Sequence, residues 1–155
     1  MKIGAAERPF LAAEARALAE QVGSGEGRAS YEEVARMAEA GEVPDESAAA
    51  VEAVVALALE TGRARAVHGP AGVRALVSVW KDTPRGELVS RELEELNEAL
   101  TALRGLPVRS VRVAATGPGT YSLGISAGDY EMRLSVDRTG IRLRSLNVGG
   151  GGIGE

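Results

Sequence analysis

The sequence of 155 residues contains no cysteine and a single histidine, His68. Without cysteine the chain forms no disulfide, offers no thiolate nucleophile and cannot ligate zinc through sulfur. One histidine also excludes a metal site built from several histidines of one chain. No spacing of serine or carboxylates ties a catalytic partner to this histidine, so we predict no catalytic residue, no metal ligand and no cofactor.

Aromatic residues are also scarce, at 3% of the chain, so a site based on aromatic stacking has few residues to draw on. Long apolar runs are missing as well. The most apolar stretch, Ala48–Leu59, contains Glu52 and is far shorter than the roughly 20 residues that cross a bilayer. Glu7 and Arg8 interrupt the N-terminal region before the apolar part of a secretory signal forms. We therefore expect a cytoplasmic protein without a membrane span.

Acidic residues exceed basic ones, 22 against 18, and give a formal net charge of −4. The charges are unevenly placed, because residues 1–60 hold 12 acids and 5 bases while residues 105–155 hold 4 acids and 6 bases. General nucleic-acid binders are usually basic. The overall charge therefore disfavours nucleic acid as a partner.

A length of 155 residues fits one domain or two very small ones. Apolar residues form 45% of the chain, which is enough for one compact core even though 26 of them are alanines. The sequence leaves open whether the helical and sheet parts share this core or form two units.

Apolar spacing predicts helices in the first half of the chain. Leu11, Ala15, Leu18 and Val22 form the stripe of a first helix over Pro9–Val22, which the glycine-rich segment Gly23–Gly27 ends. Ser30 and Glu33 have the spacing of a capping box and predict that a second helix begins at Ser30 and ends near Gly41. The apolar residues that this helix turns inward are expected to be Val34, Met37 and Ala38.

A third helix is predicted to open at Pro44 and to end at Gly62, because proline suits the first turn and glycine the residue after the last. Arg63–Val67 alternates and is expected to be extended. Residues 70–82 fit both helical and strand spacing, and we choose the helix because proline follows glycine at its start. Thr83 is then placed to cap the next helix. The apolar stripe of the third helix is expected to comprise Val51, Val54, Val55 and Ala58.

The clearest helical pattern predicts a long helix from about Pro84 to Arg104, after which the apolar period changes to two. Four strands joined by short turns are expected, and they form an antiparallel meander. The alternation slips between Leu143 and Leu146, which indicates a bulge or the end of the strand. The long helix carries its apolar stripe at Val89, Leu93, Leu96, Leu100 and Leu103.

These elements predict an α+β fold. A helical region of about four helices, residues 1–83, precedes a long amphipathic helix packed on a four-stranded antiparallel sheet, residues 84–148. Residues 149–155 are rich in glycine and are predicted to form a flexible tail. The leucine stripe is the nearest cover for the sheet, and this use is favoured over the alternative of a dimer interface through Leu93, Leu96 and Leu100.

Arginines on the polar phase of the strands, Arg112, Arg133, Arg142 and Arg144, can form a basic ridge that binds phosphates. Glu131 and Asp137 fall on the same face and favour a solvated outer surface instead. The loop Thr116–Thr120 has the glycines of a phosphate cradle, but Pro118 and Gly119 also suit the centre of a type II turn, which we favour.

His68 precedes Gly69 and Pro70, where it can serve as a general acid or base, although a surface histidine is the favoured interpretation. The first three helices can also form a helix-turn-helix element, with a wing over residues 63–80 if that stretch is extended. The recognition helix of such an element, residues 45–61, contains four acids and no base, which disfavours contact with DNA.

The leading hypothesis is a non-enzymatic cytoplasmic interaction module whose helical and sheet parts jointly bind another protein or a second copy of the chain. Amphipathic helices and an open meander with an exposed edge are common docking surfaces. Two alternatives stay open. One is a nucleic-acid-associated regulator with a winged-helix-like N-terminal region, and the other is a small enzyme with an unidentified carboxylate-based site.

Overall fold

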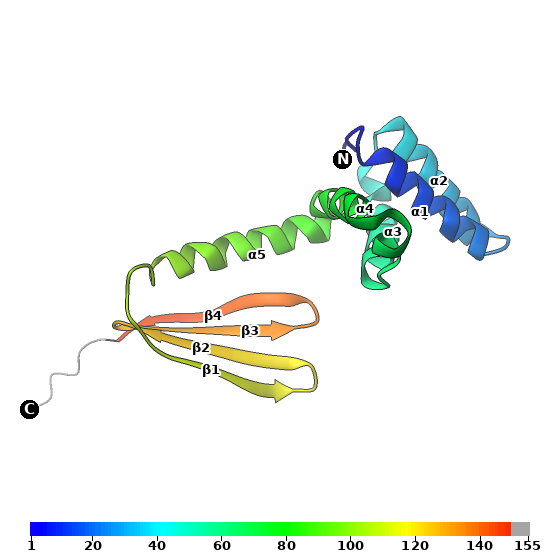
Figure 1. Ribbon diagram of the computed structural model, residues 1–155. Coiled ribbons are helices and arrows are strands. Elements are labelled where there is room, and N and C mark those ends of the chain that lie inside the picture. Colours follow the sequence, from blue (N-terminus) through cyan, green and yellow to red (C-terminus); the bar gives the residue numbers. More distant parts are fainter. Residues whose placement is uncertain (150–155) are drawn as a thin grey trace, which may run out of the picture. The chain divides into compact units, whose positions relative to one another are not determined.

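The computed structural model describes residues 1–149 and confirms the α+β fold: helices come first and an antiparallel sheet follows (Figure 1). Residues 150–155, most of the predicted glycine-rich tail, lie outside the described residues. The elements are α1 (Arg8–Gln21), α2 (Glu26–Ala40), the short 3₁₀ helix η1 (Asp45–Ser47), α3 (Ala48–Glu60), α4 (Arg63–Lys81), α5 (Pro84–Thr101), β1 (Val108–Gly117), β2 (Thr120–Ala127), β3 (Tyr130–Asp137) and β4 (Gly140–Val148).

The chain divides into two compact units. The helical unit comprises Met1–Glu87 and the sheet unit begins at Leu88, so the division falls within α5. The sequence places this division between residues 83 and 84.

The helical unit has a core of small and medium apolar side chains from α1 to α4. Leu11 and Leu76 are fully buried, and each such leucine contributes about 1.5–3 kcal/mol relative to an exposed one. The predicted inward faces of the second and third helices are confirmed. Their buried residues are Val34, Met37, Ala38, Val51, Val54, Val55 and Ala58.

Helix α2 begins four residues earlier than the capping box predicts, and this prediction was wrong. Ser30 lies inside the helix, and the residue before the first turn is Gly25 with φ 112°. Arg28 supports the early start, because its guanidinium donates to the carbonyl of Gly23 at 3.2 Å and to Glu32 at 2.7 Å. The predicted end at Gly41 is confirmed by its left-handed conformation, with φ 81°.

Helix α4 corrects a second prediction, since Arg63–Val67 is helical rather than extended. Ala64 is buried in the core, which a strand with solvent on both sides would not achieve. The helix chosen for residues 70–82 is confirmed, and a break at Gly69 (φ 64°, ψ −162°) separates it from the first turns of α4. A β wing over residues 63–80 is therefore excluded.

The turn between α4 and α5 is built around Thr83, which is fully buried. Its hydroxyl accepts from the backbone N–H of Gly86 at 3.2 Å and donates to the carbonyl of Trp80 at 2.7 Å. The predicted N-cap is thus confirmed. Helix α5 ends at Thr101, a little before the predicted Arg104.

The sheet is the predicted meander, with strand order β1-β2-β3-β4 and antiparallel neighbours throughout. Two-residue turns join the strands, and Gly119 has the positive φ of 70° that the third position of a type II turn requires. The predicted bulge in the last strand is confirmed. Arg133 pairs with Ser145 and Leu134 with Leu143, which leaves Arg144 as the extra residue.

One face of the sheet packs against α5, as the leucine stripe predicts. Leu96 of the helix is buried with Met132 and Leu134 of the sheet. Within residues 88–149, this core takes side chains from α5, the following turn, β2, β3 and β4, and none from β1. No helix among the described residues combines the length and apolar character that a membrane span needs.

Candidate interaction surface

Strand β1 is exposed along all ten of its residues. Val111 lies opposite Ile125, and Val113 opposite Leu123, whose side chains pack against the core under α5. Because opposed residues share a face, these valines lie on the face that α5 covers farther along the sheet. Apolar side chains on this uncovered strip keep large exposed fractions: Val108 63%, Val111 58%, Val113 69% and Tyr121 46%.

The outer edge of β1 offers backbone groups to a partner. Opposed residues in an antiparallel pair alternate between those that exchange backbone hydrogen bonds and those that do not. Ala127 and Tyr130 close the two-residue turn between β2 and β3 as a bonded pair, so odd-numbered residues of β2 bond to β3 and even-numbered ones to β1. Arg112, opposite Gly124, therefore bonds to β2, and the N–H and C=O groups of Val111 and Val113 point away from the sheet.

Two irregularities bound the regular part of this edge. The pairing of β1 with β2 shifts between Val108 and Ser110 and again between Ala115 and Gly117. The six residues 110–115 between the shifts pair in unbroken register. We call residues 110–115, with their outward backbone groups and the apolar side chains beside them, the β1 edge.

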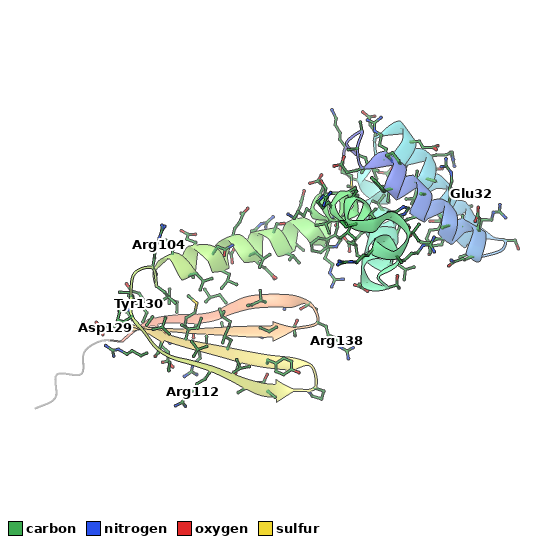
Figure 2. The ribbon with its side chains drawn as sticks, viewed as in Figure 1. Glu32, Arg104, Arg112, Asp129, Tyr130 and Arg138 are labelled. Atoms are coloured by element: carbon green, nitrogen blue, oxygen red, sulfur yellow. The ribbon has the colours of Figure 1, made fainter. Side chains whose placement is uncertain are left out.

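The opposite face of the sheet at the β1 edge is polar and hollowed. Figure 2 shows Arg112 on the face away from α5. Gly124 separates Arg112 from Arg133 on the third strand, and a side chain at Gly124 would meet open space. A shallow hollow of about 160 Å³ results. It is lined by Ser110, Arg112, Gly124, Ile125, Ser126 and Glu131.

The structure gives the four predicted arginines different partners. Arg133 donates to Glu131 at 3.2 Å, and Arg144 donates to the hydroxyl of Ser135 at 3.0 Å. Arg142 bonds to Glu92 of α5 at 3.0 Å and lies 3.5 Å from Asp137. Among the described residues, no carboxylate lies within ion-pairing distance of Arg112. Arg112 is thus the arginine of this set that remains available to a ligand.

Two pKa shifts follow from these contacts. The hydrogen bond from Arg142 to Glu92, together with the charge of Glu92, raises the pKa of the guanidinium. The pKa of Asp137 is lowered because its carboxylate accepts from the hydroxyl and then the backbone N–H of Thr139 in the turn after β3. Both groups therefore stay charged in the neutral range, and neither has the perturbation of an acid–base catalyst.

The three leucines proposed as an interface have two different surroundings. Leu96 is buried against the sheet of its own chain, and Leu100 packs beside it. Leu93 is exposed. The first two residues therefore belong to the sheet-unit core in this structure.

The helical unit contains a buried charged group that the sequence did not reveal. Glu14 of α1 is buried, and its carboxylate accepts from Arg63 Nε at 2.8 Å and lies 2.7 Å from His68 Nε2. The ring of Phe10 packs edge-on against His68. The interpretation of His68 as a surface residue was wrong, because its side chain is only 13% exposed. The contact with Glu14 joins residues 54 positions apart, so no local spacing indicates it.

Glu14 and His68 are not among the residues that line the hollows at the end of α2, beside the start of α1, or between residues 45–48 and the turn after α4. One hollow, of about 820 Å³, lies where residues 1–2 meet the end of α2 and residues 42–47. Its charged groups have mixed signs, and Glu33 and Arg36 pair with each other. The contacts of Glu14 with Arg63 and His68 join α1 to α4.

Comparison of the chain with protein families, curated proteins and solved structures finds no match.

Proposed function

We propose that the protein is a non-enzymatic, cytoplasmic interaction module that binds a partner protein at the β1 edge. The observation that carries the proposal is the combination on β1 of an outward-pointing backbone and three exposed valine side chains, with Tyr121 of β2 exposed beside them. Addition of an extended segment to a sheet edge is a recurring mode of protein recognition, in which the main chain supplies affinity and alternate side chains supply specificity.

The energetic argument favours occupation of this edge. Sheets usually protect an edge strand with a covering element, proline, a bulge or charged side chains. Residues 110–115 contain no proline and no register shift and carry one charge, Arg112, and α5 packs over the other three strands. A partner strand would form hydrogen bonds with the outward backbone groups of Val111 and Val113. It would also bury their side chains, which stabilises the complex by about 25 cal/mol per Å² of apolar surface removed from water.

The test compares the full-length protein with a Val111→Lys, Val113→Lys double variant as bait in extracts of the source cells. Both side chains are exposed on the surface, so the variant should fold, and circular dichroism checks this. The proposal expects a partner that wild type retains and the variant loses. Addition of this purified partner should also slow hydrogen exchange at the amides of Val111 and Val113.

A variant with lysines at two exposed positions of the helical unit, Val22→Lys just after α1 and Leu57→Lys in α3, serves as the matched control and should keep the partner. If the folded β1 variant retains the same proteins as wild type, the β1 edge is not the binding surface. Salt-sensitive retention of nucleic acid by wild type would instead favour the regulator hypothesis.

A further inference from the structure

We infer that the occupant of the β1 edge is an extended segment of another protein in which an acidic residue lies between two apolar ones. This inference rests on the proposed function and adds the chemistry of the partner. It follows from the side chains that residues 111–113 present on the two faces of the sheet.

The apolar positions follow from Val111 and Val113. A strand added to β1 exchanges backbone hydrogen bonds with these two residues, and the partner residues opposite them fall on the face of the uncovered strip. Val108 and Tyr121 extend this strip on the same face. Apolar partner residues there would bury the exposed valines, whereas charged ones would be desolvated against them.

The acidic position follows from Arg112, which lies between the two valines on the opposite face. The partner residue opposite Arg112 forms a pair without backbone hydrogen bonds, and side chains of such pairs approach most closely. The absence of a side chain at Gly124 leaves the guanidinium open on its inner side. Ser110 and Ser126 line the same hollow, and so does Glu131, whose carboxylate accepts from Arg133 at 3.2 Å. A carboxylate is the group that a guanidinium and two hydroxyls recognise together.

A second copy of the chain fits this edge less well. β1 contains Arg109 and Arg112 and no acid, and the other edge strand, β4, contains Arg142 and Arg144 and no acid. Pairing of either edge strand with β1 therefore places arginines near arginines without a carboxylate from the added strand. Charge complementarity thus points to a different protein.

The experiment titrates full-length, isotope-labelled protein with a blocked ten-residue peptide in which valine and glutamate alternate, followed by NMR. Two control peptides replace the glutamates by glutamine or by lysine. The expected result is shifts of the amides of residues 110–115, with the glutamate peptide binding about fivefold or more tightly than the glutamine peptide. The lysine peptide should bind least.

Three protein variants sharpen the test. Arg112→Glu should reverse the preference, so that the lysine peptide binds more tightly than the glutamate peptide. Gly124→Asp leaves the edge backbone intact and supplies a competing carboxylate beside Arg112, so it should reduce binding of the glutamate peptide. Arg138→Glu makes the same charge change in the turn after β3, where the side chain lies near Gly119 and therefore beyond the end of residues 110–115, and should leave the preference unchanged (Figure 2).

Failure of this inference is distinguishable from failure of the proposed function. Equal binding of the three peptides at residues 110–115 overturns the acidic specificity while the β1 edge still binds strands. Absence of shifts at these residues with every peptide also overturns the inference. Concentration-dependent self-association that Arg112→Glu strengthens would identify a second copy as the occupant instead.

Discussion

At the scale of single residues, the clearest example of what sequence does not reveal is Glu14. In the sequence it resembles Glu20, the other acid of α1, yet it is buried and its carboxylate contacts both Arg63 and His68. A buried carboxylate is stable only when its oxygens are paired. That pairing depends on how α4 lies against α1, which local spacing does not encode. Arg112 was identified as a candidate together with three other arginines, but the partner of Arg142, Glu92, comes from α5, and the strand pattern alone does not indicate that contact.

We predict that Glu14→Gln destabilises the helical unit. The amide keeps the shape but removes the charge that holds Arg63 and His68, which weakens two hydrogen bonds of a buried group. The expected loss in the free energy of unfolding is about 1–3 kcal/mol, measured by urea denaturation followed through the fluorescence of Trp80. Glu20→Gln, on the exposed face of the same helix, is the control. A loss no larger than that of the control would show that the buried contacts contribute little.

At the scale of elements, apolar spacing was a better guide to faces than to ends. The inward residues of α2 and α3 were predicted correctly because burial repeats along the whole helix. The start of α2 was not, because Gly25 and Arg28 provide an earlier start than the capping box at Ser30. The bulge in β4 was predictable because an extra residue in a strand interrupts the alternation of apolar side chains, and that interruption is visible in the sequence.

The turn between α4 and α5 leads to a prediction about Gly86. A methyl group on this residue would lie 1.9 Å from the carbonyl oxygen of Trp80, which is backbone and cannot move aside without disturbing α4. We expect Gly86→Ala to lower the free energy of unfolding of the helical unit by about 1–3 kcal/mol, although alanine is normally the better helix residue.

Gly27→Ala is the matched control, because this glycine lies in α2 and its nearest obstacle is the exposed side chain of Val22. Alanine there should be neutral or stabilising. Thermal unfolding of the two variants checks the contrast, and a stable Gly86→Ala protein would show that the turn adapts.

At the scale of the whole molecule, each unit has a core of its own. The helical core includes Leu76 and the sheet core includes Met132, and both residues are fully buried. The sequence predicted that α5 would cover the sheet, but not that β1 would be left uncovered. Val111 and Val113 alternate in the same way as Leu123 and Ile125, so the strand pattern does not distinguish a covered strand from an uncovered one.

Two separate cores lead us to expect two unfolding transitions. Leu76→Ala should lower the stability of the helical unit, and Met132→Ala that of the sheet unit, by about 2–5 kcal/mol each. Trp80 is the sole tryptophan and reports the helical unit, whereas hydrogen exchange at β3 amides reports the sheet. If either substitution shifts both probes equally, the units unfold together.

The arginines of the two edge strands have a consequence for handling the protein in solution. An open edge strand can pair with the edge strand of another molecule, and like charges along β1 and β4 oppose this edge-to-edge pairing. This repulsion is electrostatic and exposed, so salt weakens it, with a screening length of about 3 Å at 1 M. Concentrated solutions should therefore keep best at low ionic strength, where the edges of neighbouring molecules repel one another.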